Sequence, residues 1–224
     1  MKLELRKTAD GSNTLYLPEL DEHYHSFHGA LQEANHVFIQ NGLLNQKKTS
    51  FRVLEVGFGT GLNALLTACA SSRMGYTIDY VGIEANPVPI ELMEKMDYPR
   101  LINDKNAAVY YEQIIHSKWS AINSIHPKFQ LIKLKERVED TYIAKKFDLI
   151  YFDAFGPRVQ HEIWNVSILK KMYSFLNSAG ELVTYCAKGQ FKRDLKSSGF
   201  EVFSLEGPPG KREMVRARKN KSVF

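Results

Sequence analysis

Three glycines at alternate positions stand between an apolar run and a helix-like run in the segment RVLEVGFGTGLNALL (residues 52–66). They are Gly57, Gly59 and Gly61, and Glu55 precedes them to complete the pattern E-x-G-x-G-x-G. In such a strand-to-helix turn a ligand can approach bare backbone, and the helix that follows directs free N–H groups toward it. The pattern predicts a nucleotide-like cofactor.

The details of the loop separate the classes of nucleotide site. A dinucleotide fingerprint reads G-x-G-x-x-G, whereas the sixth position here is Leu62. A P-loop needs Gly-Lys-Ser/Thr before its helix, and the loop lacks it. Glu84 ends the next apolar strand, where a carboxylate can accept two hydrogen bonds from a ribose diol. After the third strand, Glu139 or Asp140 could receive an adenine amino group, and Asp140 is our choice.

A further carboxylate follows the fourth apolar strand. That strand ends in IYFDAFGP, in which Asp153 comes directly after the apolar run. Ligands of open α/β sheets bind beyond the carboxyl ends of the strands. We therefore expect Asp153 at the centre of any chemistry.

Strand-like and helix-like segments alternate from residue 51 onward, which is typical of a parallel, doubly wound α/β sheet. The last two apolar segments, joined by the turn GPPG, instead predict an antiparallel hairpin. Strands are expected at 51–58, 77–87, 129–137, 147–155, 180–187, 199–206 and 211–219, with helices at 62–73 and 165–177 among the connections.

The chain is expected to form one domain, 1–224, with an N-terminal extension (1–50) and a catalytic core (51–224). Short strands joined by a DGSN turn are expected in 1–22, and a helix in 27–43. The segment 87–128 is too long for a simple crossover and predicts a helical insertion beside the sheet.

Composition excludes few functions. The 224 residues carry 25% charged and 44% hydrophobic side chains, as in ordinary globular proteins. The N-terminus has no apolar signal region and no run has the length of a membrane span, so we expect a cytoplasmic protein with no membrane contact. Cys69 and Cys186 are expected to be buried, reduced thiols.

The charge balance favours an anionic partner. The formal net charge is +5, and six cations gather in GPPGKREMVRARKNK (207–221) against Glu213 alone. A solvated tail is the alternative interpretation. Four histidines (His23, His25, His28, His36) lie together but match no zinc signature, so no metal is expected.

The loop LEVGFGTG, the acid Glu84 and the terminal hairpin together resemble the class I S-adenosylmethionine-dependent methyltransferases. The resemblance implies a Rossmann-like, seven-stranded, mostly parallel sheet with a C-terminal antiparallel hairpin, and S-adenosyl-L-methionine as cofactor. A sugar- or NAD-binding α/β protein is the alternative. The D/N-P-P-Y/F motif of many enzymes that methylate nitrogen is replaced here by D-A-F-G-P at Asp153–Pro157.

The ordered blocks of the chain resemble the methyltransferase half of MnmC-type tRNA wobble-uridine enzymes, in their stand-alone MnmD-like form. These blocks are YHSFHGALQEANHVFIQNGL, LEVGFGTGLN, YFDAFGPRVQHEIW, GELVTYCAKGQFKRDLKSSGFEV and GPPGKREM. The resemblance implies N-methylation of 5-aminomethyl-2-thiouridine at the tRNA wobble position. The flavin-dependent oxidase domain of the bifunctional members is not expected in a chain of this length. FAD is not expected either, so a separate enzyme would supply the aminomethyl substrate.

The resemblance also implies roles for single residues. The cofactor loop comprises Glu55, Gly57, Gly59, Gly61 and Asn63, with Glu84 on the ribose. Asp153 would position the substrate amine, either with or without acting as its base. Tyr24 and Phe155 would stack on the flipped-out base, and Lys211 and Arg212 would contact phosphates of the anticodon stem-loop. Tyr24, Ser26 and Glu33 match an N-terminal block, and Lys211–Met214 match a K-R-E-M block.

Two other functions fit parts of the pattern. One is a methyltransferase or aminopropyltransferase acting on a small amine, although polyamine synthases usually read G-G-G-D-G in the loop. The other is a non-catalytic RNA-binding protein with a retained cofactor pocket, which intact Glu84 and Asp153 disfavour. No oligomeric state is predicted.

Overall fold

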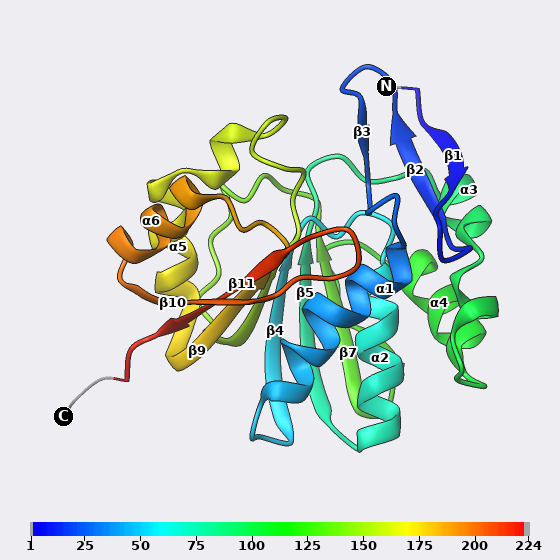
Figure 1. The fold of residues 1–224 in the computed structure, drawn as a ribbon. Helices are drawn as coiled ribbons and strands as arrows, with labels where there is room; N and C mark the ends of the chain where they lie inside the picture. Colours follow the sequence, from blue (N-terminus) through cyan, green and yellow to red (C-terminus); the bar gives the residue numbers. More distant parts are fainter. Residues whose placement is uncertain (1, 222–224) are drawn as a thin grey trace.

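The computed structural model describes residues 2–221, which form two β-sheets with helices packed against the larger one (Figure 1). The strands are β1 (Glu4–Lys7), β2 (Asn13–Leu17), β3 (Glu22–His23), β4 (Ser50–Val56), β5 (Thr77–Ile83), β6 (Asn123–His126), β7 (Phe129–Leu134), β8 (Phe147–Phe152), β9 (Leu176–Thr184), β10 (Phe200–Glu206) and β11 (Glu213–Lys219). The α-helices are α1 (Ala30–Ala34), α2 (Leu62–Met74), α3 (Ile90–Met93), α4 (Ala107–His116), α5 (Val166–Phe175) and α6 (Gly189–Ser197). A π-helical stretch η1 (Asn35–Gln40) continues α1, and short 3₁₀ turns are η2 (Leu43–Asn45), η3 (Glu94–Met96), η4 (Tyr98–Leu101) and η5 (His161–Trp164).

The larger sheet has the strand order β10-β11-β9-β8-β4-β5-β7-β6. Strands β9, β8, β4, β5 and β7 run parallel to one another, whereas β10, β11 and β6 pair antiparallel with their neighbours. The chain order reverses between β4 and its neighbours β5 and β8, and at such a switch point ligands bind beyond the carboxyl ends of the strands. The prediction of a mostly parallel sheet that ends in an antiparallel hairpin is confirmed.

The central strands are buried on both faces, as is usual for parallel strands covered by helices. Every residue of β8 is buried, and its side chains alternate between two cores. Leu149 and Tyr151 join the core beneath α1, α2 and α4. Ile150 and Phe152 join the core beneath α5 and α6. The apolar run in this strand therefore reflects its position between two helical layers.

The predicted number of strands is wrong. Within residues 2–221 the larger sheet has eight strands, because the insertion adds β6 along the edge of β7. The sequence predicts a helical insertion, and α3, α4, η3 and η4 do account for much of it. Strand β6 reads NSIH, with a single buried residue, Ile125, so it carries no alternating hydrophobic signal.

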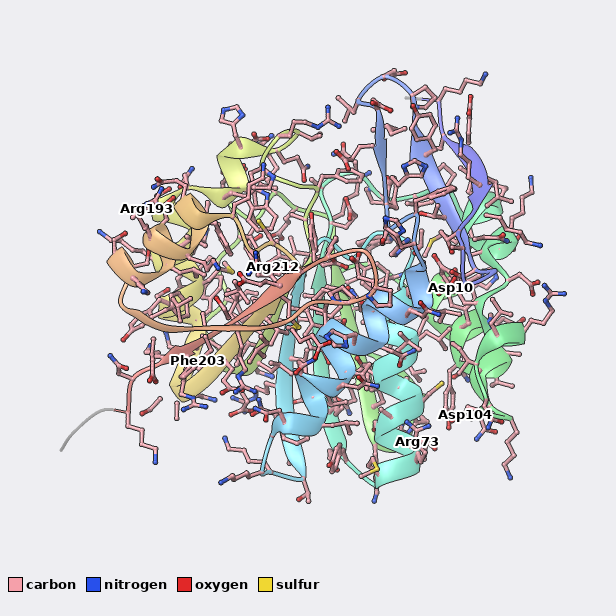
Figure 2. The ribbon with its side chains drawn as sticks, viewed as in Figure 1. Asp10, Arg73, Asp104, Arg193, Phe203 and Arg212 are labelled. Atoms are coloured by element: carbon pink, nitrogen blue, oxygen red, sulfur yellow. The ribbon has the colours of Figure 1, made fainter. Side chains whose placement is uncertain are left out.

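The N-terminal strands form a separate antiparallel sheet, β1-β2-β3, which stands beyond the upper end of the larger sheet in Figure 1. Asp10, in the β1–β2 turn, accepts hydrogen bonds from Thr8 Oγ1, Ser12 N and Gln32 N. Figure 2 shows Asp10 where the small sheet meets α1. The turn is thereby attached to α1, which fixes the small sheet over the rest of the molecule.

Other expectations about packing are also met. The helix predicted at 27–43 forms as α1 with η1, and the five apolar residues expected on its inner face are buried: Ala30, Leu31, Ala34, Val37 and Phe38. Cys69 and Cys186 are free and buried. Among the helices of residues 2–221, none combines the length and the apolar character needed to cross a bilayer. The domain boundaries stay a prediction, and positions 1 and 222–224 lie outside the described residues.

Candidate active site

A cavity of about 400 Å³ opens where β4, β5 and β8 end. Small-molecule and cofactor sites span roughly 300–1,000 Å³, so the cavity has the size of a cofactor pocket. Its floor comes from the glycine loop and from the residues after β5 and β8, while Leu3 and Leu17 of the N-terminal segment close one side. Seven of the residues predicted from the sequence line it: Tyr24, Gly57, Gly59, Asn63, Glu84, Asp153 and Phe155.

The glycine loop follows β4 directly. Gly57 has φ +90°, and a Cβ at this position would lie 2.5 Å from the carbonyl oxygen of Asp153. The amides of Gly57 and Phe58 both donate to the carbonyl of Ile83, at 3.0 Å each. Glycine is therefore required at position 57, because the chain after β8 passes directly against the loop. Gly59 has φ +51° and also lines the cavity, and a Cβ at this position would lie 3.4 Å from the ring of Tyr24.

The acid after β5 holds the glycine loop. Glu84 Oε2 accepts a hydrogen bond of 2.9 Å from the amide of Gly59, and Oε1 accepts one of 2.9 Å from the amide of Asn86. Its carboxylate therefore links the two loops that border the cavity. Burial raises the pKa of Glu84 even though these backbone amides oppose the shift. An ionised carboxylate at this position has oxygen lone pairs available to a ligand with two hydroxyl donors.

Beneath the loop, two further carboxylates share one amide. Asn63 Nδ2 lies 2.8 Å from Glu55 Oε1 and 2.8 Å from Asp153 Oδ2 and donates to both. Tyr80 OH donates to Glu55 Oε2 at 2.8 Å. Asn63 Oδ1 is buried and has no hydrogen-bond partner among residues 2–221. An orphaned buried acceptor beside a cavity is the arrangement that a bound donor would satisfy.

The electrostatics of these carboxylates favour a cationic ligand. Burial raises the pKa of Asp153 well above its usual value, with a further rise from Glu33 and opposing effects of Asn63 and Lys211. Burial likewise raises the pKa of Glu55, against the hydrogen bond from Asn63. A positive charge placed between them would stabilise both ionised forms.

Aromatic side chains form the opposite side of the cavity. The rings of Tyr24 and Phe155 meet edge to face, with centroids 4.9 Å apart. The amide of Phe155 donates to Gln160 Oε1 at 3.1 Å, and its carbonyl accepts from Trp164 Nε1 at 2.7 Å. Trp164 is buried and thus anchors this loop by packing and by its hydrogen bond to the Phe155 carbonyl. Burial, together with Glu84, raises the pKa of Tyr24 to about 12, so its hydroxyl stays protonated.

The N-terminal sheet is attached to the loop after β8. Arg158 donates to the carbonyls of Leu20 and Asp21 at 3.3 Å and 2.9 Å, and to Glu22 Oε2 at 3.0 Å. Two segments that flank the cavity are therefore connected across its rim.

Lys211 lies differently from its predicted role. Its ammonium group pairs with the carboxylate of Glu33 and lies 3.9 Å from the ring centroid of Tyr185. A lysine engaged in this way is not directed toward a phosphate in solvent, so the geometry does not support the expected RNA contact. Arg212, next in the chain, is exposed above the sheet in Figure 2, and its predicted phosphate contact stays a prediction.

Three of the six C-terminal cations, Lys211, Arg216 and Arg218, pair with carboxylates within the molecule. Arg218 Nε donates to Glu181 Oε1 at 3.0 Å, and Arg216 lies 3.8 Å from the same oxygen. Lys219 Nζ donates to the carbonyls of Tyr173 and Leu176. The tail therefore contributes less free positive charge than its composition implied.

Other predicted site residues lie outside the cavity. Asp140 lines a separate hollow with Thr141 and Tyr142, whereas Val138 and Glu139 line the cavity. The choice of Asp140 over Glu139 is therefore not supported by their positions. Glu55 lies beneath the lining, bonded to Asn63, and Gly61 (φ +77°) ends the loop as the residue before α2.

Some lining residues were not singled out by the sequence. His25 lines the cavity, and burial lowers its pKa to about 4, so it is neutral near pH 7. Gln160, Glu162 and Ile163 come from the loop after β8, whose path sequence reasoning did not predict. No group of three or more His, Cys, Asp or Glu residues in the part of the chain described here is arranged to hold a metal.

The sheet, the glycine loop, the acid after β5 and the carboxylates under the loop define the class I methyltransferase type of α/β protein. The chain belongs to the S-adenosyl-L-methionine-dependent methyltransferase family, whose model matches residues 104–220. The residues present fit this cofactor, which carries a ribose diol and a positive charge, because the carboxylates of Glu84 and Asp153 both line the cavity.

Known proteins resemble the chain over most of its length. The tRNA 5-methylaminomethyl-2-thiouridine biosynthesis bifunctional protein MnmC of Paraburkholderia xenovorans (strain LB400) is 28% identical over 222 residues, covering 92% of this chain and 34% of its own. The protein of the same name from Cupriavidus necator is 30% identical over 218 residues, covering 90% and 32%. The chain thus spans about a third of these curated relatives. The crystal structure of MnmC2 from Aquifex aeolicus superposes with a TM-score of 0.77 at 22% identity, over 99% of this chain and 71% of that one.

Proposed function

We propose that this protein methylates the amino group of 5-aminomethyl-2-thiouridine at the wobble position of tRNA, giving 5-methylaminomethyl-2-thiouridine. The names of the curated relatives support this choice of nucleoside. The observation that carries the proposal is the position of Asp153: its half-buried carboxylate lines one cavity together with the cofactor loop and the aromatic pair Tyr24–Phe155. A site that methylates an amine needs an anion for the ammonium and a surface for the group that bears it.

At the cofactor end, Glu84 would accept hydrogen bonds from the ribose hydroxyls and Gly59 would let the backbone approach the ligand. Asn63 would receive a donor on its unpaired Oδ1. We assign the adenine amino group to the neighbourhood of Glu139 rather than Asp140, since Glu139 lines the cavity. When bound, S-adenosyl-L-methionine supplies an electrophilic methyl group on a sulfonium, and its loss leaves S-adenosylhomocysteine.

At the acceptor end, the substrate amine arrives mostly protonated near neutral pH and must lose a proton before its nitrogen can react. Asp153 would hold the ammonium by charge and hydrogen bond, and orient the nitrogen lone pair once the proton has left. The raised pKa of Asp153 brings its basicity closer to that of an amine than an exposed Asp would be. Alignment of the reacting groups can supply about 7–11 kcal/mol of barrier lowering in the best cases.

The aromatic pair would receive the base. Tyr24 and Phe155 present faces and edges at the cavity rim, and unstacked bases in RNA recognition lie against such rings. Arg212, which is exposed, would contact the phosphates of the anticodon stem-loop.

The test uses purified protein, labelled S-adenosyl-L-methionine and tRNA from cells that accumulate 5-aminomethyl-2-thiouridine, followed by nucleoside mass spectrometry. We expect one added methyl group on that nucleoside and on no other. Absence of methylation, with cofactor binding still detected by calorimetry, would remove the tRNA substrate and leave small amines as the next acceptors to test.

A further inference from the structure

Three distant segments bring two opposite charges to the acceptor end. Glu33, on α1, is 8% exposed, and its carboxylate pairs with Lys211, from the link between β10 and β11. The Lys211 ammonium lies 3.9 Å from the ring centroid of Tyr185, just after β9. Tyr185 OH in turn donates to the carbonyl of Ala154 at 2.8 Å. The charge pair is therefore anchored beside Asp153.

A need for stability does not by itself explain this pair. Taking the Glu33 charge out of water costs free energy that its attraction to Lys211, whose side chain is 30% exposed, often fails to repay. Both groups also lie within electrostatic range of Asp153. Their position points to a role in the site.

The two charges act in opposite directions on Asp153. Burial is the largest effect and raises the pKa of its carboxyl; the Glu33 anion raises it further, and the Lys211 cation lowers it. The other groups around it are Asn63 from α2, which lowers the pKa through its hydrogen bond, and Glu55, Tyr80 and Tyr185, which interact with its charge from β4, β5 and the end of β9. Among the described residues, Lys211 is the cation that acts on the pKa of Asp153.

We propose that Lys211 and Glu33 are positioning residues for the transfer: the Lys211 cation favours the ionised form of Asp153 against its burial, and the Glu33 carboxylate fixes where that cation lies. The oxygen of Asp153 then stays available to an incoming ammonium group. This assignment replaces the expected phosphate contact of Lys211, and it rests on the proposed function for the nature of the acceptor.

The variants Lys211→Met and Glu33→Gln test the assignment because their effects on Asp153 have opposite signs. Loss of the cation raises the pKa of Asp153, so the acidic limb of the profile of kcat/KM against pH moves to higher pH. Loss of the anion lowers that pKa and moves the limb to lower pH. We expect kcat/KM of Lys211→Met to fall on the order of tenfold at the pH where the wild-type limb begins, since one charge at close range shifts a pKa by about one unit or more.

Further variants separate charge from folding. Lys211→Arg keeps the cation and should restore the position of the limb. The double variant Glu33→Gln/Lys211→Met leaves no unpaired buried charge, and its limb should fall between those of the single variants. Lys47→Met removes an exposed cation near the opposite end of β4 and should leave the limb in place.

The protonation of Asp153 can also be followed without measuring catalysis. The carboxyl ¹³C signal of Asp153 is assigned by its absence from Asp153→Asn and followed against pH in the folded wild type and both variants. Opposite displacements in the two variants support the assignment even if no RNA is methylated, in which case the proposed function alone fails. If the titration of Asp153 is displaced equally in the two variants, or not at all, the assignment is overturned. A Lys211→Met enzyme whose defect is confined to KM for RNA and disappears with added salt also overturns it, because that is the behaviour of a phosphate contact.

Discussion

The two ends of the cavity are built in different ways. The cofactor end comes mostly from two neighbouring β-strands and their loops, within residues 55–86, with Glu139 added from the segment after β7. Its main contacts run between backbone amides and Glu84. The acceptor end combines α1, the loop after β8, the end of β9 and the β10–β11 link. A site built from backbone groups depends on glycine and on the path of the chain, whereas a site built from side chains depends on charges that the whole fold brings together.

This difference teaches where each function can change. A short β-loop-α-β segment can hold a nucleotide in many proteins, because its contacts need little beyond glycine and one acid. The acceptor end requires that four separate segments be placed correctly, and it is where the substrate would be selected. If this division holds, changes at one end should leave binding at the other end nearly intact.

The largest effect is expected for Asp153→Asn. An amide cannot neutralise an ammonium, so methylation should fall about 10²–10⁴-fold, the usual contribution of a proton-handling group. The Asn63 hydrogen bond can be kept by the new carbonyl oxygen, so cofactor affinity should fall far less than methylation. Single-turnover methylation and calorimetry with the cofactor give the two values.

The same variant tests the non-catalytic alternative. An RNA-binding protein that merely retains a pocket would show no methylation in the wild type and the same RNA affinity in Asp153→Asn. Activity within threefold of the wild type in the variant would contradict the role of this carboxylate.

The next effect, at the cofactor end, is expected for Glu84→Gln. Hydrogen bonds to a charged group contribute about 1.5–3 kcal/mol, so cofactor affinity should fall roughly 10–100-fold while RNA affinity is retained. Asp140→Asn is the matched control, because this acid lies outside the cavity. A larger loss in the control than in Glu84→Gln would show that the adenine or ribose contacts are wrongly assigned.

A smaller effect is expected for Phe155→Ala. Stacking of a base on an aromatic ring contributes about 1–3 kcal/mol, which corresponds to a rise of roughly tenfold in KM for the RNA substrate, with KM for the cofactor unchanged. Tyr142→Ala removes a ring that is 88% exposed and lies away from the cavity, and should have no such effect. Steady-state kinetics with each substrate varied in turn distinguish the two parameters.

The smallest effect is a dependence of cofactor affinity on pH. Burial raises the pKa values of Glu55 and Asp153, and a bound cation lowers them again. Binding therefore releases protons, and affinity falls as the pH drops through the raised pKa values, above the ordinary range of carboxyl groups. Calorimetry in two buffers that differ in ionisation enthalpy should give different apparent heats. Identical heats near those pKa values would show that the cluster does not sense the cofactor's charge.

The same division explains what could be predicted from the sequence. Glu84 was predictable because an acid after the second strand of a β-loop-α-β unit meets the glycine loop by local geometry. The contact that requires glycine at position 57 could not be predicted, because it involves the carbonyl of Asp153, far along the chain. Asp140 and Glu139 are neighbours in a turn that Arg137 closes, and adjacent turn residues point to different sides. Counting the charges in the sequence could not show where the Lys211 ammonium lies, since its partner Glu33 belongs to another element.

The most direct test of the account uses a synthetic anticodon stem-loop with a single 5-aminomethyl-2-thiouridine, its N-acetylated counterpart, and S-adenosyl-L-methionine bearing a deuterated methyl group. Mass spectrometry of the nucleosides follows the label. The account predicts that one deuterated methyl group appears on the free amine and none on the acetylated one, which has neither the charge for Asp153 nor a basic nitrogen. Label on both, or label elsewhere in the RNA, would contradict it.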